Sequence, residues 1–131
     1  MKTDLIKEFL NKKNIIAVIG ASNNKSKYGN KIFHELLDYG YNVVPVNPKE
    51  TEIDGIKCYP SLKEIPTKPD VINTVVPPKV TFKIVKQAKK LSINKVWMQP
   101  GSESEETITF CKKNNIKVLS GVCIMLSLIN N

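Results

Sequence analysis

A run of apolar residues that ends at a glycine sets the fold expectation for this chain. Residues 15–19 read IIAVI, with no polar alternation, which is typical of a strand buried on both faces of a parallel sheet. Gly20, Ala21 and Ser22 follow, and residues this small let the backbone approach a ligand closely. A polar loop then leads to residues 28–37, whose apolar spacing predicts an amphipathic helix. The stretch therefore predicts a strand, a small-residue turn and a helix.

The predicted turn and helix start suit a phosphate group. The first amide N–H groups of a helix lack intrahelical acceptors, and the helix dipole is positive at that end. Lys25, Lys27 and Lys31 bring positive charge to the same place, around Tyr28 at the helix start. We therefore expect an anion to bind here.

The rest of the chain alternates strands with helices. Further strands are expected at residues 42–46, 70–76, 95–98 and 116–119. Helices are expected at residues 3–12, 61–65 and 80–91, and from Ser102 or Ser104 through Cys111. This alternation predicts an α/β fold, a Rossmann-like three-layer sandwich with a five-stranded, mainly parallel sheet. Because no repeat, low-complexity segment or internal linker is visible, residues 1–131 are expected to form a single domain.

Local signals refine these elements. Ser61, with Glu64 three residues later, predicts a capping box at the start of the short helix 61–65. Asp54 and Gly55 predict a tight turn. Pro45 has no N–H for a sheet ladder, so it is expected near a strand end or a gap in the pairing.

The net charge of +8 raises nucleic acid as a partner, but the residue types argue against it. All 20 basic residues are lysine. Arginine is the residue that contacts phosphate and guanine through two parallel hydrogen bonds, so its absence disfavours a sequence-specific reader of nucleic acid. A protein that binds polyanions without sequence preference stays open as an alternative.

The apolar runs and the cysteines of the sequence indicate the cellular compartment of the protein and the redox state of its thiols. No apolar run approaches the roughly 20 residues of a membrane span, and residues 1–14 lack the apolar core of a signal peptide. Cys58, Cys111 and Cys123 are odd in number and far apart, which predicts reduced, mostly buried thiols rather than disulfides or a zinc site. We expect a cytoplasmic protein with no membrane partner.

Two common nucleotide-binding patterns are absent. A dinucleotide fingerprint needs G-x-G-x-x-G after the first strand and an acidic residue about 20 positions later, but the loop reads GASNNKSKYG and the second strand ends at Asn47. The G-K-[ST] of a P-loop is missing as well. A sensor for NAD(P) or another nucleotide remains an alternative. Lys49 follows the second strand and adds to the lysines around the predicted helix start. Together these charges favour a ligand with more phosphate groups than a dinucleotide carries.

Candidate catalytic groups are few. His34, the single histidine, lies inside the helix predicted at residues 28–37. The sequence shows no cysteine or carboxylate placed to act with it in catalysis, so it is expected to be a surface or half-buried residue. Ser22 lacks the flanking glycines of a nucleophile elbow, so a hydrogen bond to phosphate is its expected role. No acidic or histidine cluster predicts a metal site. The sequence therefore offers no clear catalytic constellation.

Five segments, in order, carry a family resemblance. They are GASNNKSKYGNKI, GYNVVPVNPKETEIDGIKCYPSLKEIP, D-x-x-x-T-V-V-P-P, VWMQPGSESEE and V-L-S-G-V-C. Over about residues 15–125 the chain resembles the small, stand-alone coenzyme A-binding domain family, which is similar to the N-terminal domain of the succinyl-CoA synthetase α subunit. The resemblance implies a Rossmann-like fold that binds coenzyme A or an acyl-CoA, for sensing or for presentation to a partner protein. The second domain, the phosphorylated histidine and the ATP-grasp partner of the synthetase are not found in this sequence, so the resemblance implies a binding module and not an enzyme.

The resemblance also implies a set of ligand-binding residues. The pyrophosphate loop would include Gly20, Ala21, Ser22 and Tyr28, with Lys25 and Lys27 as its charges; Asn47, Pro48 and Lys49 would face the adenosine phosphates; Val76, Pro77 and Pro78 would follow the adenine or pantetheine arm; and Gln99 and Gly101 would share the rim. Members often have arginine where this chain has Lys25 and Lys27, which keeps the charge but loses bidentate geometry. The basic and acidic residues that commonly flank the cysteine are also missing, which leaves the role of Cys123 open.

Overall fold

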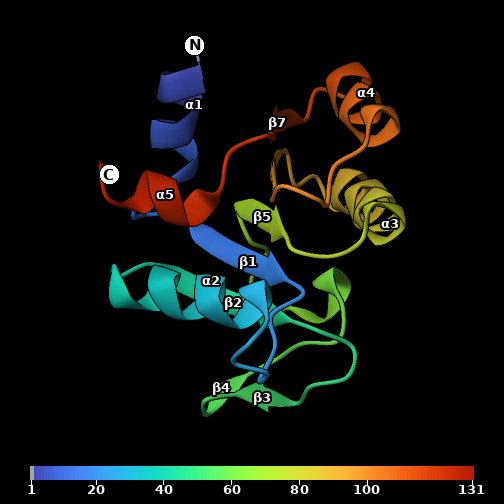
Figure 1. The fold of residues 1–131 in the computed structure, drawn as a ribbon. Coiled ribbons are helices and arrows are strands. Elements are labelled where there is room, and N and C mark those ends of the chain that lie inside the picture. Colours follow the sequence, from blue (N-terminus) through green and yellow to red (C-terminus); the bar gives the residue numbers. More distant parts are fainter. Residues whose placement is uncertain (1) are drawn as a thin grey trace.

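A central sheet orders its strands β2–β1–β5–β6–β7 (Figure 1). The strands are β1 (Ile15–Ile19), β2 (Asn42–Val46), β5 (Val71–Thr74), β6 (Lys95–Met98) and β7 (Lys117–Leu119). The computed structural model describes residues 2–131, and every pairing in this five-stranded sheet is parallel. The predicted α/β fold is thus confirmed, with a sheet that is wholly rather than mainly parallel.

Helices cover both faces of the sheet and complete the three layers (Figure 1). One face carries α1 (Lys2–Phe9), α2 (Tyr28–Asp38) and α5 (Ile124–Leu128). The other carries the 3₁₀ turn η1 (Leu62–Glu64), α3 (Pro78–Lys90) and α4 (Glu105–Lys113). Side chains of β1 alternate between the two cores, with Ile16 and Val18 facing α2 and Ala17 and Ile19 facing η1 and α3. The predicted doubly covered central strand is confirmed.

Trp97 lies at the centre of the core that α1 and α5 cover. Its side chain is 0% exposed, its ring packs edge-on against Phe9 with centroids 6.1 Å apart, and its Nε1 donates to the Val122 carbonyl at 2.8 Å. α1 ends at Phe9, before the predicted Lys12, since the Asn14 side-chain amide donates to the carbonyls of Glu8 and Phe9. These contacts attach the first helix to the sheet.

Two predicted helix starts need correction, and the third, expected at Ser102 or Ser104, is confirmed at Ser104. Residues 61–65 form only the turn η1, and Ser61 makes no side-chain capping bond, so the predicted capping box is wrong. α3 begins at Pro78 rather than Val80, because proline fits the first turn, where the N–H has no intrahelical acceptor. α4 is capped by Ser104, whose Oγ accepts from the Thr107 N–H at 3.2 Å. Ser102 instead contacts Thr74 through its hydroxyl.

A small antiparallel hairpin, β3 (Glu52–Ile53) and β4 (Ile56–Lys57), leaves the main sheet after β2. Its turn is the predicted one, with Asp54 and Gly55 both in the left-handed region at φ 50° and 79°. Pro45 is the next-to-last residue of β2, an edge strand of the sheet, in agreement with its predicted position near a strand end. The hairpin lies beside α2 at the end of the molecule away from α4 (Figure 1).

The strand order creates a crevice beside β1. The chain leaves β1 through α2 on one face to reach β2, then crosses the other face through η1 to reach β5 on the opposite side of β1. The loops that follow β1 and β5 therefore diverge to opposite faces. In open parallel sheets, ligands bind at the carboxyl ends of the strands at such a switch point. The predicted small-residue turn lies at this position.

Candidate functional site

The turn after β1 lies directly against the end of β5. The Gly20 N–H donates to the Val46 carbonyl at 2.9 Å, and the Val75 N–H donates to the Ile19 carbonyl at 2.8 Å. Gly20 has φ +102°, and a Cβ there would lie 2.5 Å from the Val75 carbonyl oxygen. Only glycine fits both the backbone angle and the space. The backbone of the turn is thus fixed between β2 and β5.

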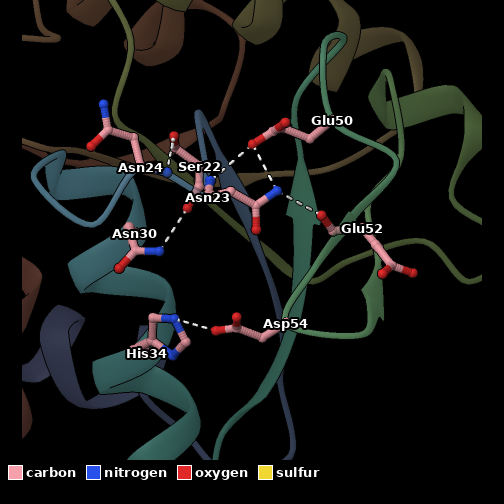
Figure 2. Close-up of polar contacts among 8 residues, drawn as sticks. All are labelled: Ser22, Asn23, Asn24, Asn30, His34, Glu50, Glu52 and Asp54. Atoms are coloured by element: carbon pink, nitrogen blue, oxygen red, sulfur yellow. Dashed lines mark hydrogen bonds and ion pairs between the residues drawn. The ribbon is translucent and has the colours of Figure 1, made fainter.

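The loop between Ser22 and α2 is folded by its own polar side chains (Figure 2). The Ser22 Oγ accepts from the Asn24 N–H at 3.0 Å, and the Asn24 Oδ1 accepts from the N–H and hydroxyl of Ser26 at 3.0 and 2.7 Å. The Asn30 side-chain amide, from inside α2, donates to the Ser22 carbonyl at 2.8 Å. These bonds hold the loop over the start of the helix.

Two asparagines tie the loop to the segment that follows β2. Asn23 donates through its backbone and side-chain N–H groups to Glu50 Oε2, both at 2.9 Å, and through its side chain to the Glu52 carbonyl at 2.8 Å (Figure 2). Asn47 donates from its side chain to the Ala21 carbonyl at 2.8 Å and accepts from the Lys49 N–H at 2.9 Å. The carboxyl ends of β1 and β2 therefore form one fixed rim.

A pocket of about 470 Å³ opens at the start of α2. Lys27, the N-cap residue, makes no side-chain capping bond, and the Asn30 N–H donates to the Lys27 carbonyl at 3.1 Å, so the amides left for a ligand at this helix start are those of Tyr28 and Gly29. The positive end of the helix dipole adds to the Lys27 charge at this place. The pocket is lined by Gly20, Ser22, Ser26, Lys27, Tyr28, Gly29, Asn47, Val75, Val76 and Pro77. Such a pocket can hold a phosphate group.

A second pocket, of about 210 Å³, adjoins the first and shares Tyr28 and Val75 with it. Gln99, Pro100 and Cys123 complete its lining. Tyr28 is 64% exposed, so its side chain lies at the surface, where it lines both pockets, rather than in the core. Together the pockets extend from the β1–α2 turn to the loop before α5.

The sequence-predicted residues divide between these pockets and their surroundings. Those that line the first pocket are Gly20, Ser22, Lys27, Tyr28, Asn47, Val76 and Pro77, and Gln99 lines the second. The others line neither: Ala21 is buried, Lys25, Pro48 and Lys49 are exposed, Pro78 opens α3, and Gly101 lies in the exposed turn after β6. The prediction omitted the pocket residues Ser26, Gly29, Val75, Pro100 and Cys123. Gly29, in the first turn of the predicted helix, was the one available signal, since a helix start that packs closely needs a small residue.

Other titratable groups lie away from the pockets. His34 Nε2 lies 2.6 Å from Asp54 Oδ2, so the histidine joins α2 to the hairpin turn (Figure 2). Sequence alone could not pair them, because they are brought together only when the hairpin folds against the helix. Among residues 2–131 no group of His, Cys, Asp and Glu side chains is arranged to hold a metal ion. No helix in that range is long and apolar enough to cross a bilayer.

Comparison with known families identifies the kind of domain. The family of the CoA binding domain matches residues 14–128, nearly the whole described chain. The α subunit of an ADP-forming acetate–CoA ligase II from Pyrococcus furiosus is 51% identical over 65 residues, which are 49% of this chain and 14% of that subunit. The chain therefore corresponds to a small part of the ligase.

Smaller proteins match over nearly their whole length. The uncharacterized protein YneT of Bacillus subtilis is 29% identical over 122 residues, which are 93% of this chain and 90% of YneT. The solved structure of a hypothetical protein from Pyrococcus horikoshii superposes with a TM-score of 0.90 at 34% identity, covering 99% of this chain and 92% of that one. The same fold thus occurs in proteins of about this size.

Proposed function

This chain belongs to the CoA binding domain family, and we propose that it binds coenzyme A or a short acyl-CoA at the β1–α2 turn without catalysing a reaction on it. The observation that carries this proposal is the first pocket. It opens at an uncapped helix start at the switch point of the sheet, and Lys27 lies in its wall. A pyrophosphate at this place would receive backbone N–H bonds and a charge-assisted bond from lysine.

The shape of the site also supports an elongated ligand. The pocket at the turn adjoins the second pocket, beside Gln99, and shares Tyr28 and Val75 with it. Coenzyme A has phosphates at its nucleotide end and an extended pantetheine arm that carries the thiol. We propose that the phosphates lie at the turn and that the arm passes Tyr28 toward Gln99.

The position of Asn47 disfavours the nicotinamide alternative. An NAD-binding fold uses a carboxylate at the end of its second strand for the ribose hydroxyls. Here the Asn47 side chain donates to the Ala21 carbonyl and accepts from the Lys49 N–H, so both of its polar atoms already have partners in the loop. A nucleotide sensor of that kind remains an outcome of the test below.

A non-catalytic binding role is supported by the residues that line the pockets. Within the described chain, neither lining includes a histidine or a carboxylate that could act as a general acid or base. Because the three cysteines are free thiols, we also propose a reducing, cytoplasmic location. The physiological role would then be to sense the ligand or to present it to a partner protein.

Isothermal calorimetry with the full chain tests the proposal. We expect saturable heat with coenzyme A and about tenfold weaker binding of dephospho-coenzyme A, which lacks one charged phosphate. NAD, NADP and ATP serve as matched nucleotides and should bind more weakly than coenzyme A. Absence of heat with coenzyme A up to about 1 mM, or tighter binding of a dinucleotide, would overturn it.

Oligonucleotide binding at several salt concentrations tests the alternative that the protein binds polyanions. If the lysines act only as a diffuse positive surface, a mixed-sequence oligonucleotide should bind with a steep salt dependence, and coenzyme A should compete poorly. Under the proposal, coenzyme A binding saturates at one ligand per chain and the oligonucleotide does not displace it.

A further inference from the structure

One of the three cysteines differs from the others in its surroundings. Cys58 and Cys111 are buried, and burial raises the pKa of both thiols, that of Cys111 to about 11. The sulfur of a thiol with a raised pKa is a poor nucleophile at neutral pH, since the thiolate is the reactive form. Cys123 is only half-buried and lines the second pocket. A reagent or ligand in that pocket therefore meets one thiol.

Gln99 fixes the position of this thiol. The Gln99 side chain is 5% exposed, and its two polar atoms contact neighbouring residues of the α5 start. Its Nε2 lies 3.3 Å from the Cys123 sulfur, and its Oε1 accepts from the Ile124 N–H at 2.7 Å. The sulfur is thus kept at the pocket wall by a buried amide.

From these observations we infer that Cys123 undergoes thiol–disulfide exchange with disulfides of coenzyme A, so that the protein captures the ligand as a mixed disulfide. This inference rests on the proposed binding of coenzyme A. Phosphates anchored at the turn beside Lys27 direct the arm past Tyr28, which both pockets share, and its sulfur end then reaches Cys123. Anchoring raises the effective concentration of the ligand sulfur at the thiol.

The exchange needs no further oxidant. The Cys123 thiolate attacks one sulfur of coenzyme A disulfide, a bond forms between that sulfur and Sγ, and the sulfur–sulfur bond of the ligand breaks. The departing coenzyme A thiolate takes up the proton that Cys123 lost. One disulfide is consumed and one is formed, so the sum of oxidation states is unchanged. A free thiol such as reduced coenzyme A reverses the step, which makes the capture stoichiometric and reversible.

Intact-mass spectrometry of the reduced full-length protein tests the inference. Incubation with coenzyme A disulfide should add one coenzyme A moiety per chain, peptide mapping should place it on Cys123, and dithiothreitol should remove it. Pantetheine disulfide is the matched probe, because it has the same arm but no nucleotide. The adduct from coenzyme A disulfide should form at least about tenfold faster than the adduct from pantetheine disulfide.

Two variants separate the parts of the argument. Cys123→Ser should abolish the adduct. Lys27→Ala should slow the reaction with coenzyme A disulfide about tenfold and leave the reaction with pantetheine disulfide unchanged, since only the former uses the phosphate contact.

The outcomes distinguish this inference from the proposed function. Calorimetric binding of reduced coenzyme A with no adduct on Cys123, or with equal rates for the two disulfides, would overturn the exchange and leave the binding proposal standing. No calorimetric binding together with equal rates would overturn both. The rate comparison uses the unmodified protein, so it decides the matter even if a variant fails to fold.

Discussion

Gly29, in the first turn of α2, packs against the carbonyl oxygen of Gly20 at the end of β1, and a Cβ at Gly29 would overlap that oxygen. The two glycines therefore bring the helix start and the turn closer together than any other residue pair would allow. The first pocket lies at this contact, and both glycines line it together with Val75, the residue after β5. The geometry of the site thus depends on the absence of two side chains.

The first prediction concerns this contact. Gly29→Ala should lower the free energy of unfolding by about 1 to 3 kcal/mol, the usual cost of overpacking a tight site, and should weaken coenzyme A binding. Glu35→Ala, at an exposed position of the same helix, is the control and should change stability by less than about 0.5 kcal/mol. Urea unfolding measures both. A Gly29→Ala protein with unchanged stability and affinity would contradict the account of the helix start.

The second prediction concerns charge at the pocket. Lys27→Ala should weaken coenzyme A binding about tenfold, the loss typical of one charge-assisted hydrogen bond. Lys112→Ala removes the same charge from an exposed position in the last turn of α4 and should leave the affinity unchanged. Calorimetry at a fixed salt concentration compares the two. Equal losses in both variants would indicate diffuse attraction to the net charge rather than a contact at the turn.

The third prediction compares two serines that the sequence marks alike as helix caps. Ser104→Ala should cost about 1 kcal/mol of stability, because its Oγ accepts the Thr107 N–H at the start of α4. Ser61→Ala should cost much less, because Ser61 makes no capping bond. Thermal unfolding of the two variants gives the difference. The ranking fails if Ser61→Ala proves as destabilising as Ser104→Ala.

The fourth prediction is a pH dependence. The hydrogen bond from Lys117, 2.7 Å away, is the chief cause that lowers the pKa of Glu8, and Lys95 at 3.8 Å contributes. Because the folded-state pKa is lowered, the stabilisation is present above the ordinary glutamate pKa of about 4.3 and is lost as the pH falls through the folded-state pKa. Since these side chains are exposed to water, the effect should be small.

Glu8→Gln tests that dependence. Its stability should fall slightly below that of the natural chain at neutral pH, and the difference should vanish on acidification. Lys117→Ala removes the other partner of this hydrogen bond and should therefore abolish the same pH dependence of stability. A difference between Glu8→Gln and the natural chain that persists in acid would assign the effect to packing instead.

Much of the fold follows from local patterns. The run 15–19 has no polar position, and the structure buries it between two helical layers. Pro45 and the Asp54–Gly55 turn lie where the backbone limits of proline and glycine place them. Helix caps at serine were harder to predict from the sequence, because a cap forms only where a full helix follows. After Ser61, residues 62–64 make only one 3₁₀ turn.

The site was predictable only in part. The turn and its lysines follow from the first strand, but Val75 and Cys123 reach the pockets from segments far away along the chain. No local pattern marks such residues, since their placement depends on the strand order. The pairing of His34 with Asp54 is likewise a tertiary contact that helical periodicity does not reveal. The roles of Lys25, Pro48, Lys49, Pro78 and Gly101, which line neither pocket, stay predictions.

Amide NMR of the labelled full-length protein, titrated with coenzyme A, tests most directly where the ligand binds. The account predicts that chemical shift changes concentrate at Gly20, Tyr28 and Gly29, include Val75, and extend to Cys123. A separate pocket between η1 and α3, lined in part by Ser61 and Lys90, is the internal comparison. Changes centred on that pocket, or none at a saturating ligand concentration, would contradict the assignment of the β1–α2 turn as the coenzyme A site.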